Sequence, residues 1–497
     1  MKRISLIIIF LIANLNAKVP DFIFTDIDEN IIKTNEKIIG KFFSGTNKFL
    51  LPQIIKAKQS FAEILYGSYG YLYANVTFAG EDLKKGYFLN YTRKKIESYD
   101  VNSKKIYNSA LSIDKLGSGF FWLLENNISM DIYLNFQTDI KGLLNNEIYN
   151  NQFKNYFIIS PNFKYNFSEN SKIKGNINYY EIKSKFESAI RYYENRILLL
   201  NSVISYEKVF SEINSLAISV FLSQHLVEFT PNRVINNIGE IKLKDKFALS
   251  VYDIIDTGLS LNLNKSYKPI VSLDFLYSNR KLKKIIPFLG FQRVYNSQRY
   301  KDFIMENYYV KVKNFLPPEI NNSFIIGANL LFFDNMIYEI KILYSSFNNG
   351  YILKEDEDSL FYIDKLDFSE LKILNNIDFK ILKFFRVKIL YEYLPYINKK
   401  VPFRSKNLFN YILDFKNSNI NLNFSVFYTD IMEYLNKELE WNWINRYLIF
   451  NLSVSYEIYK NYVINFTAEN LNIGDFYKIG KYVEPENIYQ LGIKIKF

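Results

Sequence analysis

The chain of 497 residues contains no cysteine and a single histidine, His225. The absence of cysteine excludes disulfides, thiolate metal sites, iron–sulfur ligation and a cysteine nucleophile. One histidine excludes multi-histidine metal sites, and His225 has no partners at the spacing of a catalytic or metal site. The sequence also lacks a phosphate-binding loop, a dinucleotide fingerprint and a nucleophile elbow. We therefore expect no enzyme, no catalytic, cofactor-binding or metal site, and no cofactor.

Long hydrophobic runs are also missing. Beyond the N-terminus no stretch of about 18 apolar residues occurs, which excludes helical membrane spans. Yet 48% of the residues are hydrophobic and 18% are aromatic, which is too apolar for a disordered chain. The formal net charge of +11 could attract anionic lipids or solutes. Because an AT-rich genome also enriches lysine, the charge alone identifies no partner, and nothing indicates nucleic acid.

The first 17 residues have the form of a secretory signal peptide. Lys2 and Arg3 precede an apolar run of about ten residues, and Ala17 is a small residue at a plausible cleavage point. The run is too short to cross a bilayer as a helix. We therefore expect an exported protein with a signal peptide at 1–17 and a short periplasmic segment at 18–59.

From residue 60 to residue 497 the dominant hydrophobic period is two. At the C-terminus, apolar residues alternate with Gln490, Gly492, Lys494 and Lys496. Such alternation places the two residue sets on opposite faces of a strand. The same pattern recurs in many segments along the chain, so the fold class is all-β.

Three features favour a membrane barrel over a soluble sheet protein. The alternating segments span about ten to thirteen residues, the length of a tilted membrane-crossing strand. Their polar face carries Lys, Glu, Asp and Asn with no second apolar layer, and aromatic residues lie near strand ends. We predict a closed transmembrane antiparallel β-barrel of about 22 strands over residues 60–497, located in the outer membrane and in contact with its lipid and lipopolysaccharide.

The strand prediction is specific at several places. It treats 60–78 as one strand and 304–314 as another, and it assigns extracellular loops to 225–243, 347–358 and 430–444. Short polar links are predicted to be periplasmic turns. These links are Ser168-Glu169-Asn170, Asn417-Ser418 and Lys460-Asn461.

The last 90 or so residues resemble the end of a TonB-dependent receptor barrel. The segment "VPFRSKNLFNYILDF" is similar to that family's proline-led entry into a late strand. The segment "NRYLIFNLSVSYEIYKNYVINFTAENLNIGDFY" resembles its penultimate hairpin, followed by an Asn-Leu and aromatic motif, here Glu469-Asn470-Leu471 and then Phe476-Tyr477. The end "EPENIYQLGIKIKF" resembles its last strand. Terminal Phe497 is similar to the signal read by the barrel-assembly machinery. The resemblance implies solute uptake across the outer membrane.

The resemblance has one departure. Receptors of this family carry an N-terminal plug of well over a hundred residues, whereas only 18–59 precede the first predicted strand, without a clear TonB box. We therefore expect inward loops, this segment, or a separate plug working with a TonB-type system to close the lumen. A porin-like passive channel and a structural or adhesive barrel remain alternatives.

Several clusters are candidates for binding, each with a simpler explanation. The acidic run Lys354–Ser359 could chelate a cation, but it lacks calcium-loop spacing, and a solvated loop is the simpler interpretation. The basic segments 91–99 and 280–284 could meet lipopolysaccharide phosphates, or could be ordinary charged turns. Trp441 and Trp443, with Tyr434 nearby, could form a sugar-stacking platform in an extracellular loop, although membrane-interface anchoring is the commoner role.

Overall fold

A computed structural model describes residues 60–497, apart from several short segments. These segments are 82–83, 98–99, 102–103, 106–109, 126, 144–150, 190, 212–213, 230–231, 251, 265–266, 280, 283, 297–309, 313–315, 333–334, 383, 474–476, 480–481 and 484–486. The expected signal peptide and the segment 18–59 lie outside the described residues. Within the described part, no helix is long and apolar enough to span a membrane.

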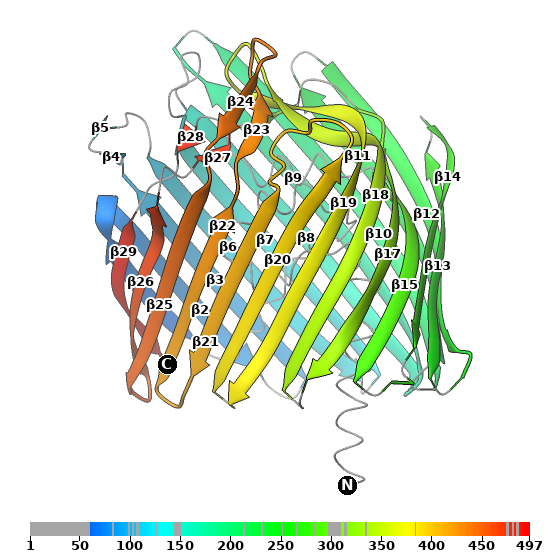
Figure 1. Cartoon of the computed structure of the whole chain (residues 1–497). Helices are drawn as coiled ribbons and strands as arrows, with labels where there is room; N and C mark the ends of the chain where they lie inside the picture. The colour runs from blue at the N-terminus through cyan, green and yellow to red at the C-terminus, as the bar shows by residue number, and fades with distance from the viewer. Residues whose placement is uncertain are drawn as a thin grey trace.

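The chain forms one closed antiparallel β-barrel (Figure 1). Its main sheet has 23 strands, of which β16 pairs with β19 from inside the wall, so that 22 strands form the barrel. The wall strands are β1 (Phe61–Gly67), β2 (Tyr71–Glu81), β3 (Lys85–Ile96), β6 (Leu111–Glu125), β7 (Ile128–Gly142), β8 (Asn151–Ser168), β9 (Ser171–Glu187), β10 (Tyr192–Ser211), β11 (Asn214–Phe229), β12 (Asn232–Ala248), β13 (Asp253–Asn264), β14 (Tyr267–Asn279), β15 (Ile285–Asn296), β17 (Glu319–Phe332), β18 (Met336–Glu355), β19 (Phe361–Leu382), β20 (Phe385–Ile397), β21 (Asn407–Lys416), β22 (Ile420–Thr429), β25 (Tyr447–Tyr459), β26 (Tyr462–Ile473) and β29 (Ile488–Lys496).

Smaller elements lie in the connections between wall strands. They are η1 (Ser68–Gly70), β4 (Asp100–Val101), β5 (Lys104–Lys105), β16 (Val310–Lys311), β23 (Met432–Leu435), β24 (Trp441–Ile444), β27 (Tyr477–Ile479) and β28 (Tyr482–Val483). The first and last wall strands, β1 and β29, pair with each other in antiparallel register and close the barrel. Closure leaves no sheet edge unpaired, as lipid requires.

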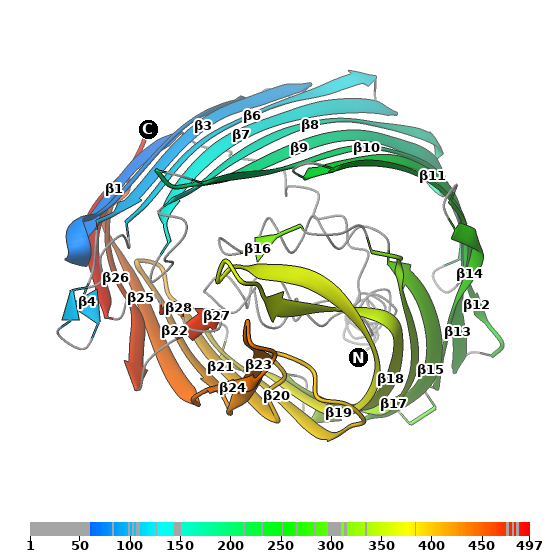
Figure 2. The ribbon, with the colours of Figure 1, turned by 90° about the horizontal axis from the view of Figure 1, so that it is seen from above.

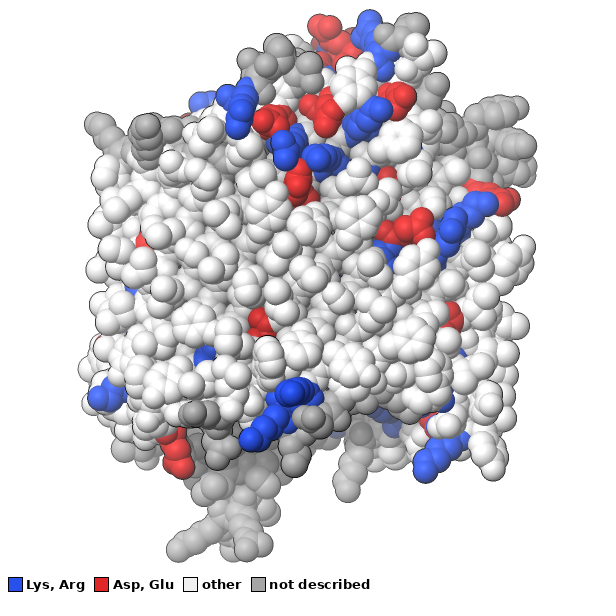
Figure 3. Space-filling model, turned by 180° about the vertical axis from the view of Figure 1, so that it is seen from behind, with Lys and Arg blue, Asp and Glu red and all other residues white. Residues whose placement is uncertain are grey.

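The period of two separates an apolar outer face from a polar inner face. On β13, Leu259, Leu261 and Leu263 are exposed on the outside, whereas Ser260 and Asn262 between them are buried. Figure 3 shows the same division on the back of the barrel, where a broad band with few charged residues separates charged groups above and below. Such a band matches the hydrocarbon layer of a membrane.

Short turns gather at the rim that carries the C-terminus, and longer connections gather at the other rim (Figure 1). The amide of Phe497 donates to the carbonyl of Ser60 at this first rim. The three predicted polar turns lie at this rim, and each directly joins two paired wall strands. Since short turns mark the periplasmic side of such barrels, the opposite rim is the extracellular mouth.

The structure corrects four parts of the strand prediction. Residues 60–78 form two strands, β1 and β2, separated by η1. The predicted strand 304–314 contributes only β16 to the described structure, and this strand is not part of the wall. The predicted loop 225–243 instead contains the end of β11 and much of β12. The predicted loop 347–358 is mostly the end of β18. Strands that rise above the membrane need no apolar outer face, so their pattern resembles that of a loop.

Candidate functional site: the bridged mouth and the polar lumen

The extracellular mouth is crossed by segments that fold inward from the wall. Figure 2 shows the joined ends of β18 and β19 curving over the lumen, with β16 beside them. The strand β16 pairs in parallel with the start of β19 through Val310–Phe361 and Lys311–Tyr362. We call β16, Val312 and residues 348–363 the mouth bridge.

A cluster of charges joins this bridge to the opposite wall; it is buried at Lys311 and Asp356 and exposed at Arg191. Lys311 lies 2.7 Å from a carboxylate oxygen of Asp356 and 2.7 Å from one of Asp358. Asp358 also pairs with Arg191, which lies between β9 and β10, at 3.1 Å. The Lys311 side chain is only 6% exposed, so removing its partners would leave a charge with little water. These pairs hold the tip of the β18–β19 hairpin against the far wall of the barrel.

Two hydrogen bonds between β10 side chains and the backbone of Val312 strengthen this junction between the bridge and the wall. The hydroxyl of Tyr193 donates to the carbonyl of Val312, and the Val312 amide donates to Oδ1 of Asn195 at 3.3 Å. The ammonium of Lys311 lies 5.4 Å from the centre of the Tyr193 ring. Beside the junction, Tyr192 donates to Glu194, which raises the pKa of Tyr192 to about 12 and keeps it neutral.

An apolar cluster lies behind the charges. Val310, Val312 and Phe361 of the bridge are fully buried, and Ile197 and Leu199 of β10 belong to the same cluster. Each side chain buried in this way contributes about 1.5–3 kcal/mol relative to an exposed one. The bridge is therefore a packed layer and not a loose loop.

A second inward element, the β23–β24 hairpin, packs onto the bridge. The rings of Phe361, Phe403 and Tyr434 contact one another, with centroids 5.6 to 6.1 Å apart. Tyr434 therefore has a packing role that the sequence did not indicate. Trp443 is 70% exposed, and Lys400 lies 5.3 Å from the Trp441 ring. The predicted loop 430–444 is therefore a loop that carries a short hairpin.

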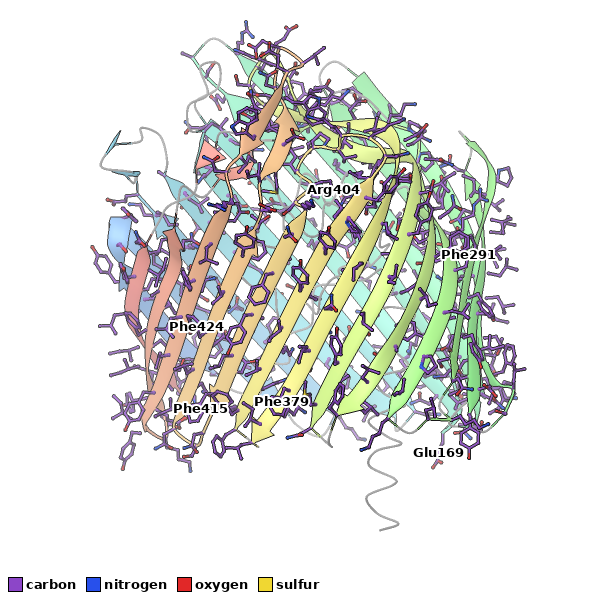
Figure 4. All side chains as sticks on the ribbon, viewed as in Figure 1. Glu169, Phe291, Phe379, Arg404, Phe415 and Phe424 are labelled. Carbon is purple, nitrogen blue, oxygen red and sulfur yellow. The ribbon has the colours of Figure 1, made fainter. Side chains whose placement is uncertain are left out.

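Below the bridge, the inner face of β18 to β20 carries paired charges. Arg404 lies 3.1 Å from Glu370, with side chains 7% and 2% exposed, and its guanidinium lies 5.5 Å from the Phe368 ring. Figure 4 shows Arg404 near the upper end of the barrel, below the β23–β24 hairpin. Lys372 joins Glu370 at 3.5 Å to Glu392 at 2.8 Å. The charges in this part of the wall therefore largely neutralise one another.

Replacing Arg404 by leucine is expected to lower the free energy of unfolding by about 3 kcal/mol, because Glu370 would lose a buried partner. The urea midpoint of the folded barrel in detergent measures this change. Lys437→Leu is the control, since its pair with Glu438 is exposed and should contribute little. Adding Glu370→Gln to the Arg404 variant should recover part of the loss. Equal midpoints for the Arg404 and Lys437 variants would contradict the assignment.

Neutral polar side chains line much of the remaining inner wall. Many of them pair across neighbouring strands, as buried polar groups generally do. Some buried polar atoms of the described residues, such as Oε1 of Gln152 and Nδ2 of Asn201, have no hydrogen-bond partner. Examples are Gln152–Ser184 at 2.6 Å, Ser160–Asn178 at 2.5 Å and Ser323–Ser345 at 2.9 Å. Small, paired polar groups of this kind suit a wetted passage.

The structure gives different outcomes for the candidates identified in the sequence. The acidic run Lys354–Ser359 forms the tip of the bridge, where Asp356 is buried, so its interpretation as a solvated loop is wrong. His225 lies within β11, not at its end, and is opposite Leu199 and Asn236. Among the described residues no group of acidic or histidine side chains could hold a metal.

The residues that form the junction were missed. Lys311 lies in a segment that was predicted to be a wall strand, and Arg191, Tyr193 and Asn195 had no assigned role. The only feature of the sequence that pointed to this junction was the opposite charge of Lys311 and the acidic run. Because lysines and acidic residues are abundant in this chain, opposite charge alone could not identify Lys311 as the partner of Asp356 and Asp358.

The comparisons with known proteins agree with this architecture. No family model matches the chain, and no curated protein matches its sequence. Among solved structures, it is similar to the siderophore receptor PirA from Acinetobacter baumannii, with 10% identity and a TM-score of 0.69 over 88% of this chain and 80% of that one. It is also similar to the FrpB iron transporter from Neisseria meningitidis, with 8% identity and a TM-score of 0.71 over 88% of this chain and 81% of that one. A third similar structure is the copper transporter OprC, with 9% identity and a TM-score of 0.70 over 88% of this chain and 80% of that one.

The chain has the barrel fold of the TonB-dependent receptors. The resemblance seen in residues 401–497 is therefore confirmed for the fold, as is the prediction of a closed barrel of 22 strands. A closed barrel with an apolar outer band is the architecture of an outer-membrane protein. The similar structures are receptors and transporters, not enzymes. With identities near 10%, the similarity extends to the fold and not to a particular solute.

Proposed function

We propose that this protein is a gated, TonB-dependent receptor-like barrel for solute uptake across the outer membrane. The observation that carries the proposal is the mouth bridge, which ties opposite walls together through Lys311, Asp356, Asp358 and Arg191. Because Lys311 and its partner Asp356 are buried, opening the mouth must break an ion pair that water screens poorly, as expected of a gate. The similar siderophore, iron and copper proteins support the same class of function.

In this proposal the bridge controls entry and the inner wall provides the route. A solute that reaches the mouth displaces the tip of the β18–β19 hairpin from the β9–β10 side. It then meets neutral polar pairs such as Ser160–Asn178 and compensated charges such as Lys372–Glu392. Because these groups already satisfy one another, none binds the solute strongly enough to stop its passage.

Several partners follow from the same proposal. A TonB-type system would supply energy, as for the receptors that share the fold, and residues 18–59 or a separate plug would act on the periplasmic side. The strand β29, which ends next to Phe497, would be read by the barrel-assembly machinery, and the outer face would contact lipid and lipopolysaccharide. The expected signal peptide at 1–17 would direct export.

Single-channel recording in planar bilayers tests the proposal. The full-length refolded protein is expected to stay closed for long periods, because the bridge crosses the mouth. Steady openings on the nanosiemens scale would overturn gating and favour the porin-like alternative. Unchanged cell adhesion after deletion of the protein would, in turn, exclude the adhesive alternative.

A further inference from the structure

A cavity of about 280 Å³ lies low in the barrel wall, far from the mouth bridge. Its lining comes from strands β10 to β15 and includes Glu207, Ala217, Lys244, Asp274 and Gln292. These strands reach their periplasmic turns only a few residues further on, as at Ala248 on β12. The cavity is therefore close to the periplasmic exit of the lumen.

The strand register places these residues in one row on the inner face. Glu207 is opposite Ala217, which is opposite Lys244. Lys244 is opposite Gly258, which is opposite Asp274, and Asp274 is opposite Gln292. Leu243 and Leu259, the neighbours of Lys244 and Gly258 in sequence, are exposed on the outside of the barrel, so the row faces the lumen.

Small residues flank Lys244 in this row. Ala217 and Gly258 lie opposite Lys244 on its two neighbouring strands. The Asp274 carboxylate lies over Gly258, where an added Cβ atom would be 2.0 Å from its Oδ2. Lys244 and Asp274 are two strands apart, which corresponds to about 10 Å between their Cα atoms. The cavity thus has a cationic side at Lys244 and an anionic side where the Asp274 carboxylate lies over Gly258.

These two charges have no partner in the described part of the chain. Lys244 and Asp274 make neither an ion pair nor a side-chain hydrogen bond there, and Lys246, which also lines the cavity, is likewise without one. Glu207, by contrast, is held at 2.8 Å by both Lys172 and Lys174. Asp256, opposite Lys246, has an interaction of its own. The open charges of the cavity are therefore Lys244 and Lys246 against Asp274.

We propose that this cavity is a subsite for a small dipolar solute that carries both a carboxylate and an ammonium group, as a short peptide does. Lys244, with Lys246 beside it, receives the carboxylate, and Asp274 receives the ammonium group. Gln292 supplies a neutral hydrogen-bonding group at the acidic end. This assignment rests on the proposed uptake function and names the class of solute that leaves through the periplasmic half of the barrel.

Isothermal titration of the full-length barrel in detergent with alanyl-alanine tests the subsite. The dipeptide is expected to bind, whereas its N-acetylated and C-amidated forms should bind at least tenfold more weakly. Lys244→Gln and Asp274→Asn should each weaken binding of the free dipeptide by a similar factor. The charge swap Lys244→Asp with Asp274→Lys should recover part of the affinity, because the dipeptide can reverse its orientation.

Lys242→Gln is the matched control. Lys242 lies on the same strand and inner face, two residues from Lys244. Among the described residues it too makes no ion pair or side-chain hydrogen bond, but it does not line the cavity. Its substitution should leave the affinity unchanged. Equal binding of free and blocked dipeptides, or no binding by a correctly folded barrel, would overturn the subsite. Because titration in detergent does not depend on the bridge, either result would leave the gating proposal to be judged by conductance.

Discussion

Replacing Lys311 by alanine is expected to open the extracellular mouth. The substitution leaves Asp356 and Asp358 facing each other in a poorly solvated place, which costs about 3 kcal/mol in the bridged state. Since 1.4 kcal/mol corresponds to a factor of ten, the open population should rise by roughly 100-fold. A cysteine introduced at Lys242, on the inner wall, would report this through its reaction with a bulky, membrane-impermeant maleimide. The chain has no cysteine of its own, so the background is clean.

An exposed ion pair at the same mouth provides the control. Lys400 lies 2.9 Å from Glu433, but the two side chains are 57% and 38% exposed. Water already screens this pair, so Lys400→Ala should change the reaction rate by less than about fivefold. Equal rates for the Lys311 and Lys400 variants would show that the buried charges do not hold the bridge closed.

Much of the barrel could be predicted from the sequence because lipid imposes a simple rule. Outside residues must be apolar and inside residues need not be, so strands such as β13 and β29 show the period of two directly. The rule ends where the membrane ends. The upper parts of β12 and β18 have water on both faces, and there the pattern no longer distinguishes strand from loop.

Two errors in the strand prediction cancelled. Joining β1 and β2 lost one strand, while assigning a wall strand to 304–314 added one. The first error arose because η1 is only three residues long and lies between two alternating runs. The second arose because β16 is apolar for a different reason: Val310 packs inside the mouth against Phe361 and not against lipid.

The mouth bridge depends on contacts that are distant in sequence. Arg191 and Asp358 are 167 positions apart, and Tyr193 and Val312 are 119 apart. No local propensity or period encodes such pairs, and the chain offers many other lysines and acids as candidates. The cavity near the periplasmic exit was missed for a similar reason, because it requires the register of six strands.

Replacing Gly492 by alanine is expected to weaken the closing seam of the barrel. A Cβ atom at this position would lie 1.9 Å from the carbonyl oxygen of Ile64 and 2.5 Å from the Leu65 side chain. Gly67 on the partner strand is equally confined, with the Tyr489 carbonyl oxygen 2.0 Å from its added Cβ. Because the obstacle is backbone, β1 and β29 must separate, at a cost of about 3 kcal/mol or more.

The loss of stability caused by Gly492→Ala should exceed that of an ordinary packing defect. Every other pair of neighbouring wall strands is consecutive along the barrel wall and is linked by the chain, whereas β1 and β29 are its first and last strands and are held together by their pairing. Separation exposes unpaired backbone groups to lipid, so we expect a lowered urea midpoint and loss of the heat-modifiable band in detergent electrophoresis. Gly239→Ala is the control, because the nearest atoms to its added Cβ are 3.8 Å away. If both variants unfolded at the same urea concentration, the seam would not be the weak point of the barrel.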